Sequence, residues 1–157
     1  MSTPPSSFDF AAAIAGRAFD PSALSQMFTS LGHSGWLGMG YHAHGADWVE
    51  LAMPWRAELV GIPADGTLAS GPIISLMDNA TSMAVWTRRG RFAPQVTLDL
   101  RVDYMRAAVP HTTLIGRGEC YKLTRSIAFV RGIAYEDDPA DPVAHVAGTF
   151  MMLGDQT

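Results

Sequence analysis

Ser70-Gly-Pro-Ile-Ile-Ser-Leu-Met-Asp78-Asn-Ala-Thr-Ser-Met-Ala-Val-Trp86 is the stretch that decides the fold. Apolar residues recur in it at spacings of three and four, which predicts one long helix packed along a broad face. These residues are Ile73, Ile74, Met77, Ala80, Ala84 and Val85. Asp78 interrupts the apolar pattern, and a carboxylate is costly to bury unless it is paired or hydrogen-bonded. Asp78 therefore lies either on the polar edge of the helix, with Ser75 and Ser82, or in a functional site.

The segments on both sides of this helix have the pattern of antiparallel strands. From Gln95 to Tyr104, apolar and polar residues alternate over ten positions, which predicts a half-buried strand. Its expected apolar side holds Val96, Leu98, Leu100, Val102 and Tyr104, and Thr97 is expected on the opposite side. Further strands are predicted at 39–44, 48–53, 113–122, 127–135 and 143–153. The predicted fold class is α+β, with an antiparallel sheet of about five to six strands wrapped around one long central helix.

Turn and cap signals set the expected boundaries of the other elements. Two short helices are predicted at 8–18 and 21–31, the second with Asp20 as N-cap, Pro21 in its first turn and Gly32 at its end. A β-turn is expected at 63–66, before the long helix. Arg88, Arg89 and Gly90 are expected to end that helix.

Composition limits the classes of protein to which this chain can belong. Its 157 residues make one domain, and its net charge of −4, without any block of like charge, gives no reason to expect a nucleic-acid partner. Cys120 is the only cysteine, so no internal disulfide forms and a reducing compartment is expected. The N-terminus lacks a signal-peptide pattern, and no apolar stretch approaches about 20 residues. We expect a soluble cytoplasmic protein without a membrane partner.

Three blocks of the sequence resemble a known family. Gly66 to Ala84, Val96 to Met105 and Arg125 to Phe129 look like the hot-dog-fold thioesterases of the phenylacetate-pathway (PaaI-like) type, in the family's order over roughly residues 36–153. The resemblance implies a hot-dog domain over 36–157, after a tail and short helices over 1–35. It also implies metal-free hydrolysis of acyl-CoA or aryl-CoA thioesters, with coenzyme A as part of the substrate and no other cofactor. The implied assembly is a homodimer, with two dimers paired into a tetramer.

The same resemblance implies roles for individual residues. Asp78 falls on the helix carboxylate that activates water or attacks the thioester, and Thr97 on a Ser/Thr position that holds this water. Gly71 falls on the second glycine of a His-Gly-Gly motif, whose backbone N–H forms the oxyanion hole. The sequence departs from the family at three positions. Ala69 stands where the motif has its histidine, and Ser70 stands where it has its first glycine. Pro63 stands six positions before Ala69, where the family has a polar residue. An alternative is therefore a hot-dog protein that binds acyl-CoA with little turnover.

The spacing of Gly71 and Asp78 suggests a site shared between two subunits. A helix N-terminus presents free N–H groups suited to a developing oxyanion. Asp78 is seven residues further on, about 10 Å along the axis, so one helix cannot easily bring both groups to one carbonyl. Two helices from the two subunits of a homodimer can.

Several other polar residues are candidates for capping the helix or for contacting the substrate. Ser70 is first an N-cap candidate; Ser70 and Asn79 are also candidate substrate contacts. Basic side chains that could bind the phosphates of coenzyme A are Arg88, Arg89, Lys122 and Arg125. The alternative for these cations is a complement to the helix dipole and solvated turn charges.

No metal site is expected. His42 and His44 would share one strand face, but no third ligand accompanies them, so ordinary strand histidines are favoured. His33, His111 and His145 belong to no recognisable triad. Cys120 is expected to be a small core residue rather than a reactive thiol.

Overall fold

The computed structural model describes residues 19–153, and the predicted helix at 8–18 lies outside them. Six strands form one antiparallel sheet in the order β1-β2-β6-β7-β8-β5. Their bounds are Gly40–His44 (β1), Trp48–Met53 (β2), Gln95–Tyr104 (β5), Leu114–Leu123 (β6), Ile127–Tyr135 (β7) and Ala144–Met152 (β8). All six predicted strands are present, each within two residues of its expected ends.

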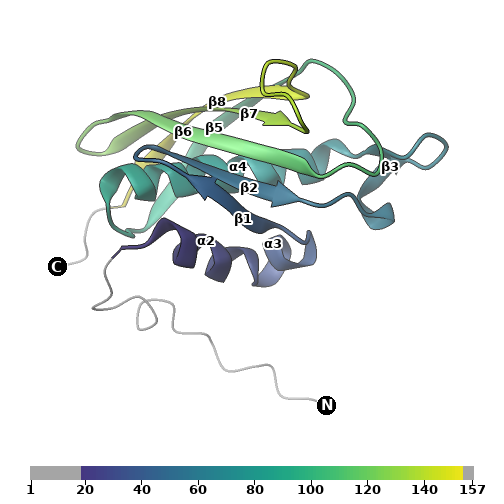
Figure 1. The fold of residues 1–157 in the computed structure, drawn as a ribbon. Coiled ribbons are helices and arrows are strands. Elements are labelled where there is room, and N and C mark those ends of the chain that lie inside the picture. Colours follow the sequence, from purple (N-terminus) through teal and green to yellow (C-terminus); the bar gives the residue numbers. More distant parts are fainter. Residues whose placement is uncertain (1–18, 154–157) are drawn as a thin grey trace, which may run out of the picture.

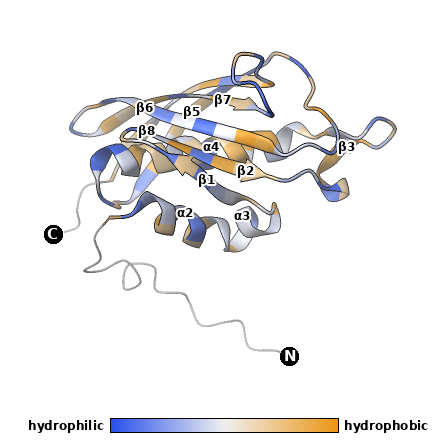
Figure 2. Cartoon of the chain, in the orientation of Figure 1, coloured by the Kyte–Doolittle hydropathy of each residue, from blue (hydrophilic) through white to orange (hydrophobic). Residues whose placement is uncertain are grey.

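The sheet curves over one long helix, α4 (Ser70–Arg89), as Figure 1 shows. This helix packs on β2, β6 and β7, and hydrophobic and hydrophilic residues alternate along the strands that cover it (Figure 2). Gly118 permits the close packing, because a Cβ there would lie 2.5 Å from the backbone of Ala80. The arrangement is the hot-dog fold that we predicted.

The C-terminal end of α4 lies where the sequence predicts it, whereas the N-terminal end corrects the prediction. Gly90 ends the helix in the left-handed conformation (φ 65°), directly after Arg88 and Arg89. The expected N-cap role of Ser70 is wrong, because Ser70 is already the first helical residue and Ala69 is the N-cap. The Ala69 N–H donates to the Leu59 carbonyl at 2.9 Å, which holds residue 69 extended before the helix begins.

A β-bulge corrects the predicted alternation in β5. Thr97 lies opposite Phe150 and Asp99 lies opposite Thr149, so Leu98 is an extra residue. Residues directly opposite in an antiparallel pair point to the same face. Phe150 is a core residue, so Thr97 faces the helix side of the sheet rather than the opposite side, and Leu98 is 52% exposed.

Two short helices lie beside β1, on the helix side of the sheet (Figure 1). They are α2 (Pro21–Thr29) and α3 (Gly32–Trp36). The predicted cap of α2 is confirmed, since the Ser22 N–H donates to the Asp20 carboxylate at 2.9 Å. The expectation that Gly32 only ends this helix is wrong: α2 stops at Thr29, and Gly32 (φ +53°) begins α3.

A small substructure precedes α4. The 3-10 helix η1 (Ala57–Leu59) leads into a two-stranded sheet of β3 (Val60–Ile62) and β4 (Thr67–Leu68), and the predicted turn at 63–66 joins these strands. Within residues 19–153, no helix is long and apolar enough to span a membrane.

Candidate active site

One side of α4 is polar along most of its length. At 100° per residue, Gly71, Ser75, Asp78, Asn79 and Ser82 fall within about a third of the helix circumference. This side is turned away from the core and lies between β5 and α3. The two readings of Asp78, as an edge residue and as a site residue, are therefore compatible.

Two residues of strand β5 donate hydrogen bonds to this polar side. The Thr97 hydroxyl donates to Asp78 Oδ1 at 2.9 Å. Further along, the Gln95 side-chain amide donates to Ser82 Oγ at 2.8 Å and to its carbonyl at 2.9 Å. Asp78 is half-buried. Because Thr97 donates to only one of the two carboxylate oxygens, each of which has two lone pairs, Asp78 retains acceptor capacity.

Helix α3 contacts the same polar side from the other flank. The Ser34 hydroxyl donates to Asn79 Oδ1 at 3.2 Å, and the Asn79 amide donates to the Ser75 carbonyl at 2.8 Å. His33 Nε2 lies 3.4 Å from Ser75 Oγ. Asn79, predicted as a substrate contact, therefore holds α3 against α4.

The N-terminus of α4 offers backbone donors. Gly71 is the second residue of the helix, so its N–H has no acceptor within the helix, and the side chain of the Ala69 N-cap cannot accept it. The Ser70 carbonyl accepts a hydrogen bond from the Tyr104 hydroxyl at 3.3 Å. Partial desolvation raises the pKa of the Tyr104 hydroxyl above its usual range.

A cavity of about 290 Å³ adjoins Gly71. It lies between α3, η1 and the first turns of α4. Its lining includes Ala69, Gly71 and Ser75 from the helix region and His33 from α3. The residue that stands where the family has its motif histidine therefore faces the same cavity as His33.

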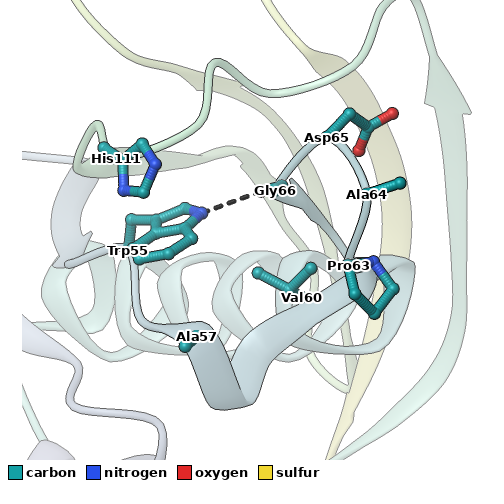
Figure 3. Close-up of a pocket in the computed structure, with 8 residues that line it drawn as sticks. All are labelled: Trp55, Ala57, Val60, Pro63, Ala64, Asp65, Gly66 and His111. Atoms are coloured by element: carbon teal, nitrogen blue, oxygen red, sulfur yellow. Dashed lines mark hydrogen bonds between the residues drawn. The ribbon is translucent and has the colours of Figure 1, made fainter.

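A second cavity, of about 400 Å³, lies beside the turn that carries Pro63. In Figure 3, Trp55 and His111 form one wall, and Val60 and Pro63 lie across from them. The Trp55 indole donates to the Gly66 carbonyl at 2.9 Å, and its ring centroid lies 4.0 Å from that of His111. Pro63, which stands at the place of the family's polar residue, thus adds an apolar ring to a cavity that His111 and Asp65 also line.

The predicted basic residues gather at the far end of α4. Arg88 donates to the Cys120 carbonyl at 2.8 Å and pairs with Asp47 at 3.4 Å. Arg89 is half-buried beside it, and Lys122 and Arg125 are exposed on the β6–β7 hairpin. Gly71 is 17 residues before Arg88, about 26 Å away along the axis. One chain therefore does not bring these cations to its own oxyanion-hole candidate.

The histidine pair expected on β1 is separated by a bulge at His42. His44 consequently aligns with Tyr41, whose hydroxyl lies 2.8 Å from His44 Nδ1. Within residues 19–153, no three His, Cys, Asp or Glu side chains are grouped as a metal site requires. Cys120 is a buried core residue, as predicted, and burial raises its pKa to about 11.

Sequence reasoning gave no site role to two residues that contact the polar side of α4, His33 and Ser34. Their helix has only five residues, too few for an amphipathic period, and glycines at 32 and 35 are typical of a loop. The only signal was a short polar segment between two apolar ones. Its contacts lie more than 40 residues away in sequence.

Comparison with known proteins assigns the chain to a family. A model of the thioesterase superfamily matches residues 65–143, about half of the chain. A solved structure from Pseudomonas aeruginosa is 36% identical with a TM-score of 0.77, covering 85% of this chain and 100% of its own. No curated protein gives a significant match.

Two other solved structures extend this likeness. A mutant of the phenylacetic acid degradation protein PaaI from Thermus thermophilus is 26% identical with a TM-score of 0.66, covering 76% of this chain and 96% of its own. A thioesterase from Haemophilus influenzae is 20% identical with a TM-score of 0.76, covering 90% and 95%, and shows a shared fold. The chain belongs to the thioesterase superfamily. It is of the PaaI-like hot-dog type, as predicted, and membership supports thioester hydrolysis as its general class of reaction.

Proposed function

We propose that this protein hydrolyses acyl-CoA or aryl-CoA thioesters at a site shared between two subunits. The observation that carries the proposal is the hydrogen bond from Thr97 to Asp78, on the same side of α4 as the Gly71 amide. A carboxylate held by one hydroxyl and open to solvent on its polar side suits a group that reacts with water or with a thioester.

Asp78 acts in one of two ways. As a general base it takes a proton from the water that attacks the thioester carbonyl; as a nucleophile it attacks that carbon itself and forms an anhydride that water then cleaves. In both cases the C–S bond breaks and the CoA thiolate leaves. The Gly71 N–H stabilises the negative charge that develops on the carbonyl oxygen.

A second copy of the chain completes this site. β5 pairs with β8 on one edge, and no other described strand covers its opposite edge. Exposed apolar side chains surround this edge and the neighbouring side of α4: Ile74, Val96, Leu98, Tyr104 and Met105. A ten-residue free edge with apolar neighbours favours pairing with another strand. Antiparallel pairing of two β5 strands about a two-fold axis brings Asp78 of one copy toward Gly71 of the other.

The dimer also gives the distant cations a role. With the two α4 helices antiparallel, the C-terminal end of one helix approaches the N-terminal end of the other. Arg88, Arg89, Lys122 and Arg125 of one copy then lie on the side of the site where the phosphates of coenzyme A extend. Pairing of two dimers into a tetramer remains part of the proposal.

A binding protein with little turnover is the second candidate. It is favoured by Ala69 and Pro63, which leave two polar positions of the family's site apolar. In this case the Gly71 amide and the cations would still bind the thioester, while Asp78 would lack the groups that position the water.

Replacing Asp78 with Asn tests the proposal. Asn retains an oxygen that accepts from Thr97, so the fold is expected to persist. It neither takes a proton nor attacks, so we expect turnover to fall by about two to four orders of magnitude. Hydrolysis of a panel of CoA thioesters is compared with binding of coenzyme A by calorimetry. Equal turnover of parent and variant would reject the proposal, and tight binding with background hydrolysis in the parent would establish the second candidate.

A further inference from the structure

Helix α3 places an imidazole in the cavity next to Gly71. His33 lines this cavity, and its Nε2 lies 3.4 Å from Ser75 Oγ. Ser75 follows Gly71 by four residues, about 6 Å along the axis. The imidazole therefore lies about one helical turn from the amide that is the oxyanion-donor candidate.

We propose that His33 is a second hydrogen-bond donor to the thioester carbonyl, beside the Gly71 amide. This inference rests on the proposed function. The contact with Ser75 is longer than the usual 2.7–3.2 Å range and is exposed, so the imidazole loses little when it turns to a carbonyl oxygen in the cavity. Ala69 offers only a methyl group to the same cavity.

The position of His33 is held by its neighbours in α3. The adjacent Ser34 donates to Asn79 on α4 at 3.2 Å, and Arg56 donates to the carbonyl of Trp36 at 2.5 Å. These two bonds tie the middle and the C-terminal end of the short helix to the rest of the domain. The backbone that carries His33 is therefore in place before the substrate arrives, and only the side chain has to turn, which keeps reorganisation small, as effective oxyanion stabilisation requires.

The cavity also indicates which acyl group binds there. Most of its wall is apolar, formed by Trp36, Leu37, Leu59, Val60, Ala69 and Pro72. Its one formally charged lining residue among those that the structure describes is Glu58, an anion. A volume of about 290 Å³ is at the lower limit for small-molecule sites. The cavity therefore suits a short, uncharged acyl chain or a single aromatic ring. Glu58 would repel an acyl group that ends in a carboxylate of its own, as a dicarboxylic acyl group does.

Variants of His33 separate this role from a structural one. For His33→Ala we expect kcat to fall about 10- to 100-fold with KM within about threefold, because an oxyanion donor acts mainly in the transition state. His33→Gln retains an N–H donor and is expected to recover part of the loss. His42→Ala, an exposed histidine on β1, is the matched control and is expected to match the parent. Thermal unfolding of each variant confirms that it is folded.

The outcomes distinguish this inference from the proposed function. If the parent hydrolyses thioesters, Asp78→Asn does not and His33→Ala retains the parental kcat, then only the role of His33 is overturned. A change in KM alone, or no recovery in His33→Gln, overturns it as well. A parent without hydrolysis rejects the proposed function itself.

A substrate panel tests the assignment of the cavity. We expect kcat/KM for butyryl-, hexanoyl- and phenylacetyl-CoA to exceed that for succinyl-CoA at least tenfold. Trp36→Ala removes a 57%-exposed wall residue and is expected to shift the preference to longer chains. Equal rates for succinyl-CoA, or an unchanged chain-length preference in Trp36→Ala, would overturn the assignment.

Discussion

The hydrogen bond between Thr97 and Asp78 makes a quantitative prediction for the variant Thr97→Val. Valine removes the hydroxyl, keeps the β-branched shape and favours a strand, so β5 is expected to persist. Hydrogen bonds to charged groups contribute about 1.5–3 kcal/mol, and each 1.4 kcal/mol is a factor of ten in rate. Because Thr97 is exposed in the single chain, we take the lower end and expect kcat to fall about tenfold. Thr97→Ser retains the hydroxyl and is expected to stay within threefold of the parent.

A double-mutant cycle shows whether Thr97 acts through Asp78. In the Asp78→Asn background the carboxylate is already absent, so adding Thr97→Val is expected to change turnover less than about twofold. The assay measures release of free coenzyme A with a thiol reagent, and the buried Cys120 is not expected to react with it in the folded protein. The reasoning is refuted if Thr97→Val has the parental kcat, or if it lowers turnover equally in both backgrounds.

Four further predictions address the amide, the helix packing, the dimer and alkaline stability. Gly71→Pro removes the N–H in a helical turn that tolerates proline, and we expect kcat to fall about 10²- to 10³-fold. Gly71→Ala keeps the N–H, and its Cβ has open space, so this variant should retain activity. Equal kcat in the two variants would argue against the Gly71 amide as oxyanion donor. Gly118→Ala brings a Cβ to 2.5 Å from the backbone of α4 and should lower the free energy of unfolding, measured with urea, by about 1–3 kcal/mol. Gly71→Ala, the control, should leave this free energy unchanged. Leu98→Lys adds a charge to the free edge of β5 and should yield inactive monomers in analytical ultracentrifugation; an active monomer would contradict the shared site. Burial raises the pKa of Cys120 from 9.0 to about 11 and that of Tyr135 from 10.0 to about 12. The protonated forms of both side chains therefore stabilise the folded state, fully below about pH 9, and this stabilisation is lost as the pH rises through the folded-state pKa values. Urea unfolding at pH 8 and pH 10.5 should show this loss, and equal midpoints would contradict it.

The sequence by itself determined the long helix, the six strands of the main sheet and the class of fold. The 3–4 spacing of apolar residues in α4 and the strand-like runs that form β6, β7 and β8 are local signals, and of the six apolar residues predicted for the packed side of α4 all but Ile74 are buried. The caps at Asp20 and Gly90 are equally local, because they depend on side chains or backbone angles within one turn of the helix end. The resemblance to the thioesterases followed from the same local blocks.

The tertiary structure decided which side chains meet. Strict alternation placed Thr97 away from the helix, and only the pairing of β5 with β8 reveals the extra residue at Leu98 that turns Thr97 toward Asp78. His33 lies 42 residues before Ser75, in a helix too short to have a period, and no local pattern encodes their contact. Register and long-range packing are set by the whole core at once, whereas periodicity and caps are set within a few residues. For this reason the sequence offered the polar helix edge as one of two interpretations of Asp78, and the resemblance alone placed Thr97 in the same site, whereas the contacts of His33 and Ser34 with α4 required the tertiary structure.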